Sequence, residues 1–346
     1  MRKIAIVIEN AFLYAGTENI CNFMSECFGD KNEVDIISLN GTPPSFYPFS
    51  FANNIITFHS SKYRLLGVIK HLKSSSYDRV YVITMGKLSV LFSILMKTYL
   101  LDSSRIISCE HVSLASFNNI VKFLKFISLR FYREVVVLTD KDSVILSRWG
   151  VKNRVIKNPI VFRGYERTLT YKRALAIGRL SPQKGFDRLL YIWSEFVKNN
   201  KNWVLQIAGD GPELNNLKMI ISKLNLEGSV ALLGKVKEIN ELYKNSDIYL
   251  MTSRYEGLPL VLLEAKSWSL PVISYDCPTG PAEIINDGVD GYLIEDENSS
   301  EFIEKMTHLI STPGLLVQMS NNCKTSSLEF SSEKISQQWL KTLEDN

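Results

Sequence analysis

The sequence predicts an α/β protein with two domains, each a parallel sheet covered by helices. Its 346 residues exceed the usual size of one domain, so each of two domains has enough chain for its own core. Short β-type runs alternate with helical patterns, which is the order typical of parallel sheets. The apolar content of 45% and the charged content of 22% are ordinary for a soluble globular protein.

The alternation is clearest in residues 1–160. Expected strands lie at 3–8, 33–38, 55–58, 79–83, 105–109, 135–138 and 154–156. Expected helices lie at 17–28, 64–74, 87–100, 117–132 and 141–149. Because ligands of such sheets bind at the carboxyl ends of the strands, the residues just after each strand are the candidates for a functional site.

Composition and hydropathy exclude several classes of protein. The five cysteines are scattered and form no C-x-x-C pair, so neither a disulfide framework nor a zinc site is indicated. The apolar run at the start stops at Glu9, which favours a first strand over a signal peptide. The apolar stretch 88–96 is shorter than the roughly 20 residues that span a bilayer. We therefore expect a cytoplasmic protein with reduced thiols that is not integral to a membrane.

The charge is unevenly distributed along the chain. Residues 1–160 carry 20 Lys and Arg against 12 Asp and Glu, a net charge of +8. Residues 161–346 carry 20 against 24, a net charge of −4. A basic half joined to an acidic half indicates that the first half meets an anionic surface or substrate.

Two loops of the first half carry candidate site residues. Ala15-Gly16-Thr17 follows the first strand and enters a helix, and a plain turn is the alternative reading. The G-x-G-x-x-G pattern of dinucleotide-binding oxidoreductases is absent, which argues against NAD. His111 follows the strand at 105–109 and the acid Glu110, a position from which a histidine can line a cleft.

The stretch 117–133 holds five aromatic residues and four cations, Lys122, Lys125, Arg130 and Arg133, and no acid. It reads either as an amphipathic helix on an anionic membrane or as a core helix with a solvated basic edge.

Asp140 and Asp142 form a D-x-D pattern where a strand ends and a helix begins. Acids at this place cap helix amides and suit the helix dipole, so we expect capping and no metal site.

The second half opens with an expected strand at 174–178, followed by Arg179, Lys184 and Gly185. Two cations at the mouth of a strand can neutralise an anionic group of a ligand without a metal. Further expected strands lie at 205–208, before the turn residues 209–212, and at 230–236 and 248–251, with a helix at 237–244 between the last two. Later helices are expected at 299–311, 314–325 and 332–343.

The stretch 254–265 is the centre of the second half. Glu256 lies in a turn, Pro259 stands where a helix begins, and Glu264 lies eight residues after Glu256 on that helix. The helix is apolar around most of its circumference, so we expect it to be buried and Glu264 to need a polar partner. The amides of Gly257 and Leu258 at its start are suited to an anion.

Taken together, these segments resemble the retaining glycosyltransferases of family 4, which have the GT-B fold, and the resemblance covers nearly the whole chain. It implies two Rossmann-like domains facing across a cleft. Residues 1–162 would bind the acceptor, residues 163–329 would bind the nucleotide sugar, and the helix at 330–346 would cross back to the first domain.

The resemblance also implies roles for single residues. Arg179, Lys184 and the amides of Gly257 and Leu258 would hold the donor diphosphate, and Glu264 would hold the ribose. Glu256 would hold the donor sugar, and His111 would contact that sugar or the acceptor. The other positions implied in the donor site are Gly16, Gly178, Gly209 and Val236, with the base read by backbone groups around Val236.

The expected activity is transfer of a hexose or N-acetylhexosamine from a UDP-sugar to a saccharide on a polyprenyl diphosphate, as in O-antigen, capsule or exopolysaccharide synthesis. No cofactor and no nucleic acid partner are expected. Two alternatives stay open, a nucleotide-sugar epimerase on the same fold and a non-catalytic nucleotide-sugar binding protein. An epimerase would turn over its substrate without an acceptor, and a binding protein would not turn it over at all.

Overall fold

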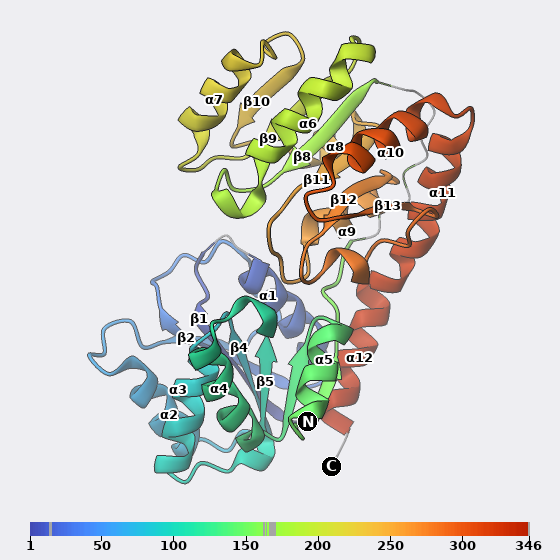
Figure 1. Ribbon diagram of the computed structural model, residues 1–346. Coiled ribbons are helices and arrows are strands. Elements are labelled where there is room, and N and C mark those ends of the chain that lie inside the picture. Colours follow the sequence, from blue (N-terminus) through green and yellow to red (C-terminus); the bar gives the residue numbers. More distant parts are fainter. Residues whose placement is uncertain (14–15, 162, 164, 166–170, 345–346) are drawn as a thin grey trace. The chain divides into compact units, whose positions relative to one another are not determined.

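The computed structural model describes residues 1–13, 16–161, 163, 165 and 171–344. Two compact units make up the fold (Figure 1). Unit 1 comprises Met1–Pro159 and Glu333–Asn346, and unit 2 comprises Ile160–Ser332. The divisions expected from the sequence were 162/163 and 329/330. Ala15, and most of the polar connection expected at 163–171, lie outside the described residues.

Unit 1 is built on a seven-stranded sheet with the order β3-β2-β1-β4-β5-β6-β7, and all neighbouring strands are parallel. The strands are β1 (Lys3–Asn10), β2 (Glu33–Asn40), β3 (Asn54–Thr57), β4 (Arg79–Thr84), β5 (Ile106–Glu110), β6 (Glu134–Val137) and β7 (Asn153–Val155). The helices are α1 (Gly16–Gly29), α2 (Arg64–Ser74), α3 (Leu88–Thr98), α4 (Asn119–Ser128), α5 (Asp140–Arg148) and, from the end of the chain, α12 (Ser332–Glu344).

Helices cover both faces of the unit 1 sheet, and each strand supplies both cores. Ile4 and Ile6 of β1 pack with residues of α1 and α12, whereas Ala5 and Val7 pack with residues of α2, α3 and α5. This alternation follows from the two-residue period of a strand. It explains why the strands read as continuous apolar runs in the sequence.

The final helix is part of the unit 1 core. Trp339 of α12 lies edge-on to Phe28 and to Tyr81, and Thr342 Oγ1 shares a hydrogen bond of 2.5 Å with the Tyr81 hydroxyl. All four side chains are buried.

Unit 2 is built on a six-stranded parallel sheet with the order β10-β9-β8-β11-β12-β13. The strands are β8 (Arg173–Ile177), β9 (Val204–Ala208), β10 (Val230–Gly234), β11 (Ile248–Met251), β12 (Val272–Asp276) and β13 (Gly291–Glu295). The helices are α6 (Phe186–Asn199), α7 (Leu214–Lys223), α8 (Ile239–Lys244), α9 (Leu260–Ser267), α10 (Ser299–Ser311) and α11 (Leu315–Ser327). Residues of α6, α7 and α10 fill the core on one face, and α9 packs against α11.

The order of the strands reverses once in each unit, between β1 and β4 in unit 1 and between β8 and β11 in unit 2. In open α/β sheets the crevice at such a reversal, outside the carboxyl ends of the strands, is where ligands bind. The loops after β8 and β11 are therefore the place in unit 2 where a ligand is expected. No helix of the described residues is long and apolar enough to cross a membrane.

Two of the expected elements differ from those observed. The strand expected at 230–236 ends at Gly234, whose φ of +65° is incompatible with an extended strand. The helix expected at 117–132 is shorter, because it gives way to a 3-10 turn at Leu129–Phe131.

Candidate active site

The candidate site in unit 2 is formed by the loops that follow β8 and β11. These two strands pair in parallel, with Ala174 opposite Ile248 and Leu175 opposite Tyr249. Their carboxyl ends therefore open at the same edge of the sheet. The first loop leads to α6, and the second leads to α9.

A set of hydrogen bonds ties the two loops together. The Thr252 hydroxyl donates to the Gly185 carbonyl at 2.8 Å, and the Arg254 amide donates to the Gln183 carbonyl at 2.8 Å. Gly185 has a φ of +64°, and a Cβ at this position would lie 2.1 Å from the Thr252 carbonyl oxygen. Only glycine permits this close approach of the two loops.

A bidentate ion pair reinforces the same contact. The Arg254 guanidinium donates to both carboxylate oxygens of Asp187, at 3.0 and 2.7 Å. This pair lowers the pKa of Asp187, because its hydrogen bonds and charge outweigh the opposing effect of burial. The loop after β11 is thus fixed to the first turn of α6.

Lys184 and Glu256 are brought into direct contact by this arrangement. Lys184 Nζ donates to Glu256 Oε1 at 2.7 Å. Glu256 is only 8% exposed, and its backbone carbonyl accepts a hydrogen bond from the Thr279 hydroxyl. A Cβ at position 178 would lie 3.2 Å from the aliphatic part of Lys184, so Gly178 makes room for the lysine chain.

Arg179 and two backbone amides complete the polar groups at this edge. Arg179 is exposed and has no carboxylate partner among the described residues. Within the residues that the structure describes, the amides of Gly257 and Leu258 donate to no acceptor, as expected just before the first turn of a helix. Together the Arg179 guanidinium and these two amides are suited to an anion.

Gly280 holds a neighbouring loop close to these amides. Its φ is +99°, and a Cβ there would lie 2.4 Å from the Gly257 carbonyl oxygen and 2.5 Å from Pro259 Cδ. The loop after β12 therefore packs directly on the backbone that precedes α9.

Glu264 has the polar partner that its position requires. The Tyr243 hydroxyl of α8 donates to Glu264 Oε2 at 2.7 Å. Burial raises the pKa of Glu264, while this hydrogen bond and the charge of Arg163 lower it to a smaller extent. The raised pKa reflects a carboxylate that is poorly hydrated.

The expectation of a fully buried motif helix was wrong in detail. Leu260, Val261 and Glu264 are partly exposed, whereas Lys266 and Ser267 are buried. The helix begins at Leu260, one residue later than expected, and Pro259 is its N-cap residue. Apolar residues on most sides of α9 did not mean that every side is buried. One side of the helix lies at the edge of the sheet where the strands end.

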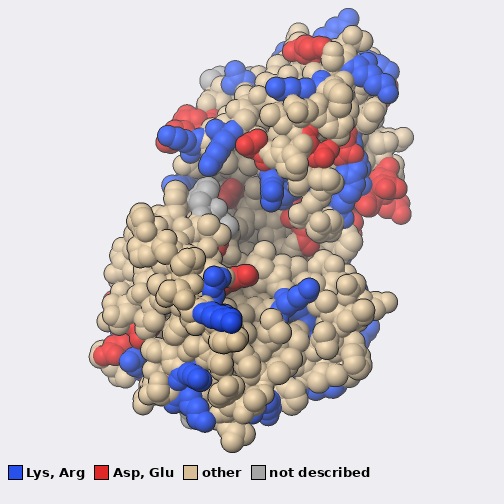
Figure 2. Space-filling model, turned by 90° about the vertical axis from the view of Figure 1, so that its left-hand side faces the viewer, with Lys and Arg blue, Asp and Glu red and all other residues tan. Residues whose placement is uncertain are grey.

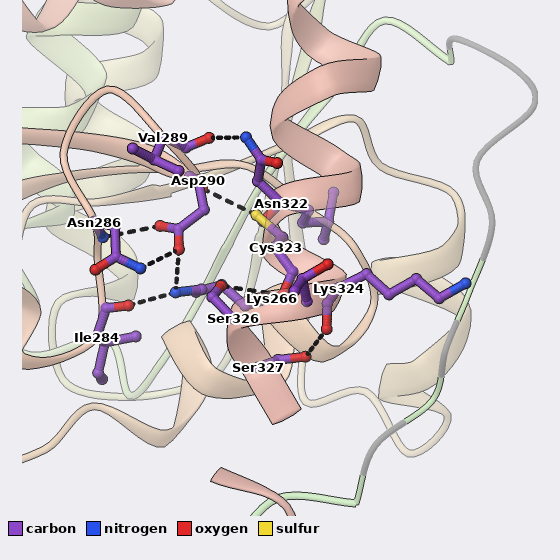
Figure 3. Close-up of polar contacts among 12 residues, drawn as sticks. Lys266, Ile284, Asn286, Val289, Asp290, Asn322, Cys323, Lys324, Ser326 and Ser327 are labelled. Atoms are coloured by element: carbon purple, nitrogen blue, oxygen red, sulfur yellow. Dashed lines mark hydrogen bonds and ion pairs between the residues drawn. The ribbon is translucent and has the colours of Figure 1, made fainter. Parts of the chain in front are cut away.

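Lys266 anchors the end of the motif helix (Figure 3). Its ammonium donates to Asp290 Oδ2 at 2.8 Å and to the Ile284 carbonyl oxygen. Asp290 also accepts from the amide and the side chain of Asn286, each at 2.9 Å. Both members of the ion pair are buried, so removing either would leave an uncompensated charge inside the unit. This network holds α9 against the loop at 284–290.

The glycines assigned to the donor site lie on neighbouring strands. The Gly178 amide donates to the Ala208 carbonyl and the Gly209 amide to the Gly234 carbonyl. A Cβ at position 209 would lie 1.8 Å from the Gly178 carbonyl oxygen. Val236 lies in the loop after β10, so Gly178, Gly209 and Val236 follow three adjacent strands at one edge of the sheet.

The remaining predicted residues, Gly16 and His111, lie in unit 1. Gly16 begins α1, next to a cavity of about 310 Å³ at the ends of β1, β2 and β4. Polar and apolar side chains both line this cavity, and the lining residues are Ile8, Glu9, Asn10, Leu13, Thr17, Glu18, Asn40, Ile83 and Met85. Burial raises the pKa of Glu18, which accepts a hydrogen bond of 2.8 Å from Thr17.

His111 follows β5, and its amide donates to the Thr84 carbonyl at 3.0 Å. Burial lowers the pKa of His111 to about 4. The imidazole is therefore neutral at pH 7 and can exchange hydrogen bonds without carrying a charge.

The structure corrects the reading of the 117–133 stretch as a core helix with a solvated basic edge. Lys125 is fully buried and donates to Glu110 Oε2 at 2.5 Å and to the Ser89 hydroxyl at 3.0 Å. The basic side chain points inward, because Glu110 at the end of β5 supplies a buried partner. Lys125 is thus unable to contribute to any surface charge.

The D-x-D acids open α5, but the capping residue is Thr139. Its hydroxyl accepts from the Asp142 amide at 3.1 Å and donates to Asp142 Oδ2 at 2.9 Å. Asp142 Oδ1 accepts from the Leu114 amide and the Ser113 hydroxyl. Burial raises the pKa of Asp142. Asp142 therefore has a structural role that links α5 to the loop after β5.

Sequence reasoning missed Tyr243, Asp187 and Thr252, all of which fix the predicted residues in place. Asp187 and Arg254 belong to segments 67 residues apart and carry no motif of their own. A glutamate on a helix expected to be buried was a signal that some partner existed, but not that it was Tyr243.

Comparison with known proteins adds three findings. The family model described as "Glycosyl transferases group 1" matches residues 160–326. The amylovoran biosynthesis glycosyltransferase AmsD of Erwinia amylovora is 36% identical over 352 residues, which cover 98% of this chain and 99% of AmsD. The crystal structure of HepE from Anabaena in complex with UDP and glucose has a TM-score of 0.82 at 18% identity, covering 99% of this chain and 100% of HepE.

One further relative is named for a lipid-linked acceptor. The "GalNAc-alpha-(1->4)-GalNAc-alpha-(1->3)-diNAcBac-PP-undecaprenol alpha-1,4-N-acetyl-D-galactosaminyltransferase" of Campylobacter jejuni is 26% identical over 227 residues, which cover 64% of this chain and 63% of that protein. The likeness to HepE confirms the expected GT-B fold of two Rossmann-like domains.

Proposed function

The chain belongs to the group 1 glycosyl transferases, of the type that acts in bacterial surface-polysaccharide synthesis, and we propose that it moves a hexose or N-acetylhexosamine from a UDP-sugar to a saccharide acceptor with retention of configuration. The observation that carries this proposal is the joining of the loops after β8 and β11, which places Lys184 against Glu256 beside the free amides that precede α9. UDP as the nucleotide is supported by the complex of HepE with UDP and glucose.

In this proposal unit 2 binds the donor. Arg179, Lys184 and the amides of Gly257 and Leu258 neutralise the diphosphate as it departs, since fixed cations and amides stabilise developing negative charge. Glu264 accepts hydrogen bonds from the ribose hydroxyls, and Tyr243 holds its carboxylate in place. Glu256 holds hydroxyls of the donor sugar and exchanges part of its contact with Lys184 for them.

Retention would proceed by attack on the face from which the diphosphate leaves. The acceptor oxygen bonds to the anomeric carbon as the bond from that carbon to the phosphate oxygen breaks, and the acceptor proton passes to the departing phosphate oxygen. This route needs no carboxylate nucleophile. It fits the engagement of Glu256 by Lys184 at 2.7 Å, which lowers the nucleophilicity of that carboxylate.

Unit 1 would bind the acceptor. The cavity at the ends of β1, β2 and β4 combines carboxylates and amides, which suit sugar hydroxyls, with apolar side chains, which suit the faces of a sugar ring. His111, neutral at pH 7, would donate to a sugar hydroxyl or accept from one. A saccharide on a polyprenyl diphosphate is supported as acceptor by the name of the Campylobacter jejuni relative, and it would bring this chain to the cytoplasmic face of a membrane.

The test is mass spectrometry of the products formed from a panel of UDP-sugars and a polyprenyl-diphosphate-linked saccharide. We expect one added hexose or N-acetylhexosamine, with the anomeric configuration of the donor by NMR. Conversion of the UDP-sugar without acceptor would show an epimerase. Binding of UDP without any turnover would show a non-catalytic protein.

A further inference from the structure

Helix α4 exposes four large apolar residues and buries a lysine and a serine. Ile120 is 73% exposed and Phe123 is 61% exposed, and Leu124 and Ile127 on the same face are exposed as well. Its buried residues are Lys125 and Ser128. This is the reverse of the usual pattern for a helix at a protein surface, where the apolar stripe faces the core. An apolar helix face in water indicates a partner that covers it.

Helix α3 extends this apolar face. Leu91 and Ile94, three residues apart on α3, are both exposed. The two helices are in contact, since Lys125 of α4 donates to Ser89 of α3, and Lys97 at the end of α3 lies 4.6 Å from the centre of the Phe131 ring that follows α4. The name "α3–α4 surface" is used below for the exposed residues Leu91, Ile94, Ile120, Phe123, Leu124, Ile127 and Phe131.

Cations, and no acids, accompany the α3–α4 surface. Neither α3 nor α4 contains an acidic residue, whereas Lys87, Lys97, Lys122 and Arg130 lie on or next to the two helices. The two acids between residues 85 and 133 are both paired with cations, Asp102 with Arg105 and Glu110 with buried Lys125. On the side of unit 1 where α2 and α3 lie, Figure 2 shows a largely uncharged surface with more Lys and Arg than Asp and Glu.

We propose that the α3–α4 surface docks on the headgroup region of an anionic lipid bilayer. The exposed isoleucine, leucine and phenylalanine side chains would enter the boundary between headgroups and acyl chains, and the surrounding cations would contact lipid phosphates. A protein partner of matching shape would also cover apolar residues, but the uncompensated cations favour an anionic surface. The inference deepens the proposed function, and rests on it, by naming the surface through which a lipid-linked acceptor is reached.

The buried pair of Lys125 and Glu110 makes this inverted helix possible. Lys125 Nζ reaches Glu110 Oε2 at 2.5 Å and leaves no polar group of the buried face without a partner. Glu110 directly precedes His111, so the same pair attaches the docking helix to the strand end that carries His111.

The test is flotation of the full chain with vesicles. We expect binding to vesicles of equal parts phosphatidylglycerol and phosphatidylcholine, weaker binding as salt is added, and little binding to phosphatidylcholine alone. The double variant Phe123→Asn, Ile127→Asn should bind about tenfold more weakly or worse, because it removes inserted apolar area. The matched control Met219→Asn, Val317→Asn changes two exposed apolar residues of unit 2 and should bind like the wild type.

A second pair of variants tests the cations. Lys97→Gln with Lys122→Gln should weaken binding to the anionic vesicles about fivefold per lysine, whereas Lys218→Gln with Lys223→Gln on α7 should leave it unchanged. Equal binding to both kinds of vesicle, or binding to neither, would overturn the proposal. The proposal would also be overturned if light scattering showed a dimer of the wild type and the Phe123→Asn, Ile127→Asn variant were a monomer. The Phe123→Asn, Ile127→Asn variant should transfer sugar to a lipid-free saccharide acceptor as the wild type does. Loss of that transfer would count against the proposed function and not against the docking surface.

Discussion

Lys184 Nζ lies 2.7 Å from Glu256 Oε1, although the resemblance to family 4 implies that the two residues hold different parts of a donor, the diphosphate and the sugar. The contact joins the loop after β8 to the loop after β11. In the free protein each residue therefore satisfies the other, and Glu256 is not left as an unpaired buried charge. Under the proposed function, a donor that enters this edge of the sheet would have to compete with the pair, so its diphosphate and its sugar would meet groups that are coupled before binding.

The first prediction concerns the cations. Arg179→Ala and Lys184→Ala should each lower kcat/KM by roughly 30- to 1000-fold, as expected when a charge-assisted contact to a departing diphosphate is lost. Arg179→Ala should leave the melting temperature unchanged, because the side chain is exposed. Lys184→Ala should lower it, because Glu256 loses its partner, and adding Glu256→Gln should restore part of that loss. Wild-type turnover in both single variants would exclude a diphosphate clamp.

The second prediction concerns pH and His111. Its pKa of about 4 in the folded protein lies below the value of about 6.5 in an unfolded chain, so the unfolded state binds the extra proton first. Stability should be fully present above pH 6.5 and decline as the pH falls toward 4. The wild type should lose about 1–2 kcal/mol more than His111→Gln between pH 7 and pH 5.

Urea unfolding of the two proteins at both pH values measures this difference. His71, whose pKa is also lowered by burial, titrates in both proteins and cancels in the comparison. An equal loss of unfolding free energy in the wild type and His111→Gln would show that burial does not lower the pKa of His111.

The third prediction concerns the D-x-D pattern. Activity should survive a chelator and the change Asp140→Asn, because the proposed clamp uses cations and amides. Asp142→Asn should cost about 1 kcal/mol of stability, since its carboxylate accepts from Leu114, Ser113 and Thr139. Loss of activity with chelator, restored by Mn²⁺ or Mg²⁺, would contradict the account.

The fourth prediction is that Glu264 destabilises the protein that holds no donor. Burial raises its pKa above the unfolded value, so its contribution to stability is present at low pH and is lost as the pH rises through the folded pKa. Glu264→Gln should therefore unfold at a higher temperature than the wild type at pH 7, while the two proteins converge in acid. A lower melting temperature for Glu264→Gln at pH 7 would contradict this reading.

Most of the fold was accessible from the sequence, because both sheets are parallel and buried. Their strands are unbroken apolar runs between helical patterns, and most observed boundaries lie within one or two residues of those expected. The order of the strands was not accessible from this pattern, since local periodicity carries no information about which strands are neighbours. The reversal between β8 and β11, which positions the candidate site, comes from the structure.

The site was predictable where it rests on local motifs and not where it rests on long-range pairs. The glycines and charged residues after β8 and β11 were identified from their place in turns after strands and from the resemblance to family 4. Their bonds to one another, such as Arg254 with Asp187, join segments that no short pattern connects. Of the two readings left open for 117–133, the core helix with a solvated basic edge fails at Lys125, which has a partner on β5. Only tertiary structure shows that this lysine of a basic stretch is buried.

The most direct test of the central claim is calorimetry of UDP binding to Glu264→Ala and to Glu256→Gln. Glu264 should hold the ribose, so Glu264→Ala should bind UDP at least about tenfold more weakly. Glu256 should hold the donor sugar, which UDP lacks, so Glu256→Gln should bind UDP like the wild type while its kcat falls. The reverse pattern would show that the two carboxylates have exchanged roles, and unchanged UDP affinity in both variants would show that this edge of the sheet does not bind the nucleotide.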